Sequence, residues 1–219
     1  MTSSEAGRRL LLVRHGEPDL PPGKKYCLGR TDVPLGPAGR RQAALLGEAL
    51  RGLSAAVFAS PLRRAKETAA AISPDFREKP GLEEMDAGEW DGLSFDEIRK
   101  KYPREYEARG KDPACPIPQA EPYAAVQARA MRALKEILES TEGTVILVAH
   151  RTVIGVILTA LKGEPAERCR EYALPCGAYY DLTLSADGCF SGSVTPVLPQ
   201  DTSKNENIKM APCGREGNQ

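Results

Sequence analysis

The sequence predicts an α/β fold, a three-layer sandwich in which helices flank a mostly parallel central sheet. Three short apolar runs, each the length of a buried strand, alternate with segments of helical periodicity. The runs are RLLLVR at residues 9–14, AAVFA at 55–59 and TVILVA at 144–149. Two of them end beside the chain's only histidines, His15 and His150. Ligands of open α/β sheets bind beyond the carboxyl ends of the strands, so both histidines are candidate site residues.

Length and composition indicate one globular domain. The chain has 219 residues, of which 41% are hydrophobic, and its basic and acidic residues balance at 30 each. That balance predicts neither a nucleic-acid nor an acidic-membrane partner, and no apolar run reaches the roughly 18 residues of a membrane span. The N-terminus lacks the apolar segment of a secretory signal, which predicts a cytoplasmic protein. The six cysteines form no CxxC pair, so we expect reduced thiols and no zinc site.

The chain between the first two apolar runs divides into a loop and a helix. Residues 16–39 are rich in glycine and proline and predict a long irregular loop. Apolar residues at helical spacing predict a helix from Pro37 to Leu53. After the second run, Ser60 and Pro61 match the N-cap and first position of another helix, which places Arg64 near its start.

The middle of the chain is more broken. Residues 79–92 are acidic, interrupted by glycine and irregular. Ser94 and Glu97 predict a capping box for a helix that ends at Tyr102. A proline-rich loop follows over residues 112–122.

The last part of the chain predicts helices around the third apolar run and then a hairpin. Residues 123–140 form a strong amphipathic pattern, and a further helix follows the apolar run as far as Leu161. Residues 179–184 alternate between apolar and polar, and the turn signal at 185–188 predicts a hairpin with residues 190–197.

The domain organisation follows from where the apolar periodicity stops. From residue 199 onward the chain is polar with no apolar period, which predicts a disordered tail. We therefore expect a single catalytic domain over residues 1–198 and a tail over 199–219. No internal repeat is present.

Four segments carry side chains suited to phosphoryl transfer. They are Arg14-His15-Gly16-Glu17, residues 60–65, Glu83-Glu84 and His150. Histidine can act as a nucleophile or an acid/base near neutral pH, and arginine donates two parallel hydrogen bonds to phosphate. Nearby arginines also disfavour an imidazolium, which keeps a neutral nucleophile populated. The pattern therefore predicts a phosphate site.

Taken in order, these segments resemble the histidine phosphatase superfamily, in its phosphoglycerate-mutase-like branch. The matching text is LLVRHGE, GRTDVPLGPAGRRQA, SPLRRAKETA, LEEMDAGEWDG, PQAEP and VILVAH, within residues 9–160. The resemblance implies a phosphoglycerate-mutase-like sandwich and a histidine acid-type phosphatase, a phosphoric monoester hydrolase that needs no metal or other cofactor. α-Ribazole phosphatases look similar in length and motif spacing.

The resemblance also implies a role for each of five residues. His15 would be the nucleophile that becomes a phosphohistidine. Arg14, Arg64 and His150 would surround the phosphate, with His150 as a positioning charge. Glu84 would protonate the leaving group.

For two of these assignments the sequence also offers a neighbouring residue, and a nearby tryptophan has two interpretations. If the motif is shifted by one residue, Glu83 instead of Glu84 is the proton donor. The motif fits only one of two neighbouring arginines, so Arg63 is expected at the surface. Trp90 is expected to pack in the core under the acidic loop rather than contact substrate.

Four further residues are candidate phosphate or substrate contacts. In the loop YCLGRTDVP, Gly29 is expected to contact the substrate through its backbone, and Arg30 either contacts it or lies at the surface. Arg151 stands where the family usually has glycine, and it either adds a cation that favours substrates with a second anionic group or points to solvent. The backbone N–H groups of Arg151 and Thr152 begin a helix and are suited to binding phosphate.

These features favour a metal-independent phosphomonoesterase acting on a small phosphorylated metabolite, with α-ribazole phosphate as the first candidate. The run RHGEPDLPP lacks the hydroxyl and amide that mutases carry after this motif, which favours net hydrolysis. A phosphoglycerate mutase is the second hypothesis and a weakly catalytic phosphate-binding regulatory module the third. We expect no nucleic-acid or membrane partner; the oligomeric state stays open, a dimer being one option.

Overall fold

The computed structural model describes residues 8–112, 114–185 and 195–199. The expected tail after Pro199 and most of the expected hairpin turn lie outside these residues. Within the described part of the chain, no helix is both long enough and apolar enough to cross a membrane.

One six-stranded sheet organises the molecule, in the order β3-β2-β4-β1-β5-β6. The strands are β1 Arg8–Arg14, β2 Ala55–Ala59, β3 Arg77–Glu78, β4 Thr144–Ala149, β5 Tyr179–Leu184 and β6 Pro196–Val197. Strands β1 to β4 run parallel, and β5 and β6 are antiparallel additions at one edge. The mostly parallel sheet is therefore confirmed.

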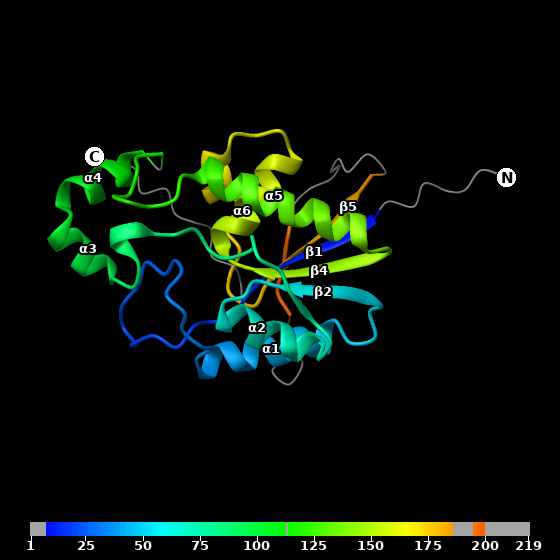
Figure 1. The fold of residues 1–219 in the computed structure, drawn as a ribbon. Helices are drawn as coiled ribbons and strands as arrows, with labels where there is room; N and C mark the ends of the chain where they lie inside the picture. The colour runs from blue at the N-terminus through cyan, green and yellow to red at the C-terminus, as the bar shows by residue number, and fades with distance from the viewer. Residues whose placement is uncertain (1–7, 113, 186–194, 200–219) are drawn as a thin grey trace, which may run out of the picture.

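Helices cover both faces of the sheet, which confirms the three-layer sandwich (Figure 1). Helices α1 (Pro37–Ala49) and α2 (Arg63–Ile72) lie on one face, and α5 (Tyr123–Ser140) and α6 (Arg151–Leu161) lie on the other. Alternate strand residues enter two separate cores: Leu11 and Ile146 pack toward α1 and α2, whereas Leu10 and Leu147 pack on the opposite side. Burial on both faces explains why these strands read as continuous apolar runs.

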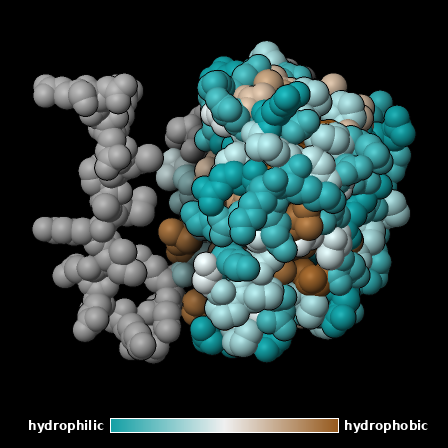
Figure 2. Space-filling model, turned by 90° about the vertical axis from the view of Figure 1, so that its left-hand side faces the viewer, coloured by the Kyte–Doolittle hydropathy of each residue, from teal (hydrophilic) through white to brown (hydrophobic). Residues whose placement is uncertain are grey.

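A smaller layer lies beyond the carboxyl ends of the parallel strands (Figure 1). It contains η1 (Gly88–Trp90), α3 (Phe95–Lys101), α4 (Pro103–Lys111) and the long loop after β1, while η2 (Ala166–Glu171) packs on α6. Figure 2 looks onto this end of the molecule, where hydrophilic residues predominate and hydrophobic ones appear in small groups.

The long loop is fixed by backbone hydrogen bonds to the segment before α3. The amide of Cys27 donates to Leu93 O at 2.9 Å, and the amide of Phe95 donates to Lys25 O at 2.9 Å. The expected capping box of Ser94 and Glu97 is present. The loop is irregular, as expected, but it is held against the rest of the molecule.

Two predicted helix boundaries are wrong. The helix expected from Ser60 begins at Arg63, with Leu62 as its N-cap, because the backbone is still extended at Leu62 (ψ 137°). Helix α1 ends at Ala49 rather than Leu53, since Gly52 turns the chain with a φ of 78°.

Candidate active site

Sheet order brings both histidines together at the carboxyl edge. Strand β4 lies between β1 and β2, so His15, His150 and Ser60, which follow these three strands, are neighbours. The amides of His15 and Ser60 continue the strand pairing, donating to Ala149 O at 3.1 Å and Val148 O at 2.9 Å. The two imidazole centroids are 5.0 Å apart, and His150 Nε2 lies 2.8 Å from Ser60 Oγ.

His15 is held as an oriented, neutral imidazole. Its Nδ1 lies 2.6 Å from Gly16 O. Because a carbonyl oxygen can only accept, Nδ1 carries the hydrogen and Nε2 keeps its lone pair. Burial, together with the positive charges of Arg64 and Arg14, lowers the pKa of His15 well below 6.5. The Nε2 lone pair is therefore available for attack at neutral pH.

The structure brings Arg14 and Arg64 to the histidines and leaves Arg63 at the surface. Arg64 is 1% exposed, and its guanidinium donates to Thr31 O at 2.9 Å and Gly29 O at 2.8 Å. Arg14 donates to Leu174 O at 2.6 Å. The side chain of Arg63 is 55% exposed, as its surface interpretation expected.

Three residues near His15 have buried nitrogens without a hydrogen-bond partner. Among the described residues, four buried side-chain nitrogens lack a hydrogen-bond partner: Arg14 Nε, Arg64 Nε, His150 Nδ1 and Trp90 Nε1. Three of the four belong to the residues next to His15. A buried unpaired polar group costs about 1–3 kcal/mol, which a ligand rich in acceptor oxygens would recover. The oxygens of a phosphoryl group are such acceptors.

The structure places His150 beside His15, but its surroundings disfavour the positive charge that the sequence suggested. It is fully buried, and burial with the nearby Arg64, His15 and Arg14 lowers its pKa well below 6.5. In the free protein its imidazole is neutral, so it can act on an anion as a hydrogen-bond donor rather than as a cation.

The carboxylate of Glu84 is fixed at the start of α6. Its Oε1 accepts from the Met85 amide at 2.8 Å, and its Oε2 accepts from the Thr152 amide at 3.2 Å. Glu84 is 8% exposed. Glu83 turns away, accepting from the Gly81 amide at 2.8 Å. The geometry favours Glu84 over the alternative register.

The structure gives Thr152 and Gly29 roles that differ from those expected. The Thr152 amide holds Glu84, so it is already paired rather than open to phosphate. The Gly29 amide donates to Asp91 Oδ1 at 2.8 Å, and its carbonyl accepts from Arg64. A Cβ at position 29 would lie 2.7 Å from Met85 O, so glycine is needed there for close packing.

Arg30 and Arg151 lie at the surface, and Trp90 is buried. Arg30 is exposed and its guanidinium lies 3.4 Å from the Glu121 carboxylate. Arg151 is exposed at the start of α6. Trp90 is 3% exposed and belongs to the core beside Tyr106.

Sequence reasoning missed Asp91 and Thr68, which support the site. The Asp91 carboxylate accepts from the amides of Gly29 and Thr31, the two residues whose carbonyls hold Arg64. Thr68 Oγ1 donates to Arg64 O at 2.7 Å and accepts from the Gly16 amide at 3.0 Å. Asp91 stands within EWDG, and Thr68 follows Arg64 by four residues on the same helix. Neither pattern shows which backbone groups these side chains bind.

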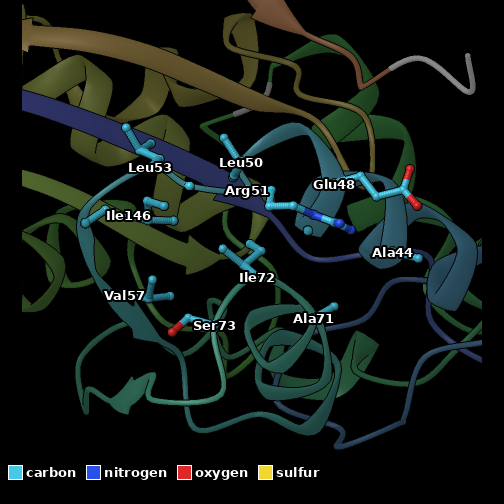
Figure 3. A pocket seen from close by; sticks show the side chains of 13 residues that line it. Ala44, Glu48, Leu50, Arg51, Leu53, Val57, Ala71, Ile72, Ser73 and Ile146 are labelled. Carbon is cyan, nitrogen blue, oxygen red and sulfur yellow. The ribbon is translucent and has the colours of Figure 1, made fainter.

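A hollow of about 460 Å³ lies at the amino-terminal side of the sheet, away from the candidate site (Figure 3). Its labelled side chains come from the end of α1, the end of α2 and the start of β2, with Ile146 of β4. Glu48 and Arg51 are its charged residues. It lies at the amino ends of the strands, away from His15, and no part of the candidate site belongs to it.

The lowered histidine pKa values predict how stability depends on pH. The free energy of unfolding should fall as the pH drops below about 6.5, because the unfolded chain then binds protons that native His15 and His150 do not. Urea unfolding between about pH 5.5 and 7.5 measures this slope, which is at most about 1.4 kcal/mol per pH unit for each histidine. His15→Gln and His150→Gln should each remove part of the slope; an unchanged slope in both variants contradicts the assignment.

Comparison with known proteins points to one family. The family model described as the histidine phosphatase superfamily (branch 1) matches residues 10–194. An uncharacterized phosphatase, PhoE of Bacillus subtilis, is 33% identical over 162 residues, which cover 71% of this chain and 78% of PhoE. Mycobacterial relatives that are 37% identical over 157 residues are longer proteins, and the chain spans 43% of their length.

Solved structures share the fold over nearly their whole length. An Escherichia coli protein provisionally described as an alpha-ribazole-5'-P phosphatase is 25% identical with a TM-score of 0.76, covering 89% of this chain and 97% of its own. The mycobacterial glucosyl-3-phosphoglycerate phosphatase Rv2419c is 27% identical with a TM-score of 0.74, covering 88% and 97%.

Proposed function

The chain belongs to branch 1 of the histidine phosphatase superfamily, and on that premise we propose that it is a phosphomonoesterase working through a phosphohistidine on His15. The observation that carries this proposal is the set of unpaired buried nitrogens of Arg14, Arg64 and His150 around the neutral ring of His15. A binding module would need the same donors. It would not need a buried acidic side chain such as Glu84 that can give and take a proton.

In the first step, His15 Nε2 attacks phosphorus, an N–P bond forms and the ester P–O bond breaks. The leaving oxygen takes a proton from the Glu84 carboxyl group. Charge on the equatorial oxygens is stabilised by the guanidinium groups of Arg14 and Arg64 and by the His150 N–H. Splitting hydrolysis in two replaces one difficult step with two easier ones.

In the second step, water attacks the phosphohistidine and Glu84 accepts its proton. The N–P bond breaks, which releases inorganic phosphate and restores neutral His15. The two guanidinium groups supply the positive charge that a metal ion would otherwise provide. We therefore propose a metal-independent reaction of the histidine acid phosphatase type, with a rate that EDTA leaves unchanged.

The substrate we propose is a small phosphorylated metabolite, with α-ribazole 5'-phosphate as the first candidate. The similarity to the Escherichia coli structure supports that choice, and the similarity to Rv2419c adds glucosyl-3-phosphoglycerate as the second. A panel of these esters with 2- and 3-phosphoglycerate, assayed for released phosphate, tests the proposal. Interconversion of the phosphoglycerates with little free phosphate would instead identify a mutase.

Glu84→Gln should lower kcat about 100-fold or more on alkyl phosphates, because the amide cannot protonate the leaving oxygen. The loss should be smaller for p-nitrophenyl phosphate, whose leaving group is stable without a proton. Glu83→Gln is the matched control, since Glu83 turns toward Gly81 and Arg129. Equal losses in the two variants, or one loss independent of the leaving group, would remove Glu84 from this role.

Arg151→Gly tests whether the exposed cation selects substrate. If Arg151 binds a second anionic group, the variant should lose about tenfold in kcat/KM for esters that carry an additional carboxylate or phosphate, with little change for simple alkyl phosphates. Steady-state kinetics on both classes decide the matter. Equal changes for both classes would mean that Arg151 points to solvent and does not select the substrate.

A further inference from the structure

A buried hydroxyl contacts the second histidine on the side away from its unpaired nitrogen. Ser60 is 0% exposed and follows β2 directly, and its Oγ lies 2.8 Å from His150 Nε2. The contact follows from the sheet order, because β2 and β4 are neighbours and Ser60 and His150 each continue their strand by one residue. The other ring nitrogen, Nδ1, is buried and has no partner.

The hydrogen bonds around Ser60 indicate which ring nitrogen carries the proton. Ser60 Oγ accepts from the Leu62 amide at 3.3 Å, so one of its lone pairs is already used. Its single hydrogen has His150 Nε2 within hydrogen-bond distance. If that hydrogen is donated, Nε2 is an acceptor, and a neutral imidazole then carries its own hydrogen on Nδ1.

The opposite tautomer fits an anion site poorly. With hydrogen on Nε2, the unpaired Nδ1 would present a lone pair close to the positive charges of Arg14 and Arg64, where an anion is expected. A lone pair repels phosphate oxygens, whereas an N–H group binds them.

We propose that Ser60 is a positioning residue that holds neutral His150 as its Nδ1–H tautomer and so aims a hydrogen-bond donor at the phosphoryl group. This inference rests on the proposed function for its consequence, but the tautomer is a property of the free protein. A neutral donor binds phosphate oxygens without requiring an imidazolium, so it stays in place above the ordinary histidine pKa.

NMR of the ¹⁵N-labelled protein tests the tautomer directly. The chain has only two histidines, so His15→Gln leaves the signals of His150 alone. Above about pH 7, we expect a protonated-nitrogen shift at His150 Nδ1 and an unprotonated one at Nε2. The reverse assignment in the wild-type protein overturns the proposal.

Ser60→Ala should mix the two tautomers and lower both the affinity for inorganic phosphate and kcat/KM about tenfold, the effect of about 1.4 kcal/mol. Ser60→Thr, which keeps the hydroxyl, should restore the Nδ1–H signal. Ser94→Ala is the matched control, since Ser94 is equally buried but caps α3 instead. An unchanged tautomer in Ser60→Ala overturns the proposal, whereas a wild-type protein that hydrolyses no ester refutes only the proposed function.

Discussion

His15→Ala should lower kcat for phosphate release by about 10⁴-fold or more, because the variant cannot form the N–P bond on which both steps depend. Substrate should still bind, since Arg14, Arg64 and His150 remain. Release of phosphate measured with the best ester of the panel gives kcat, and isothermal titration with inorganic phosphate gives the affinity.

The control for His15→Ala is its folding, because the imidazole is 5% exposed and its loss leaves a small cavity. Urea unfolding should remain cooperative, with a free energy within about 3 kcal/mol of the wild type. A folded variant that keeps activity within about tenfold would mean that water attacks the ester directly. His15 would then be only a contact residue.

Arg64→Ala should lower kcat/KM about 1000-fold, because it removes a charge from the transition state and releases the carbonyls of Gly29 and Thr31. Its neighbour on α2 supplies a matched control. Arg63→Ala should change kcat/KM by less than about twofold, since that side chain is 55% exposed. Steady-state kinetics on both variants test the pair.

Arg64→Lys separates charge from geometry. Lysine keeps the charge but lacks the planar fork that holds two carbonyls, so we expect activity between those of the wild type and the alanine variant. If Arg63→Ala loses activity and Arg64→Ala keeps it, then Arg63, and not Arg64, is the arginine that binds the phosphate.

The strands and the candidate site residues were predictable from the sequence for one physical reason. Strands buried on both faces must be continuously apolar, so β1, β2 and β4 appear as short runs with sharp ends. The polar residues that follow these ends belong to the site. The ordered motifs then predicted Arg64 and Glu84, and the structure places both side chains in buried positions.

Other features of the fold and the site depend on contacts between residues that are far apart in the sequence, which a sequence motif does not show. Ser60 followed by proline has the form of a helix cap, yet its hydroxyl faces a histidine ninety positions away. Helix α4 buries none of its residues, so it left no apolar period to detect. Thr152 and Gly29 lie in the expected segments, but their amides donate hydrogen bonds to the carboxylates of Glu84 and Asp91 and are not open to a ligand.

The formation of a phosphohistidine on His15 tests the account most directly. Wild-type protein mixed with a ³²P-labelled ester and quenched in alkali within milliseconds should carry up to one phosphoryl group per chain. The label should be stable in base and lost in acid, and mass spectrometry should place it on His15. A chain that releases phosphate with no label on His15 at any quench time, or with the label on another residue, would contradict the account.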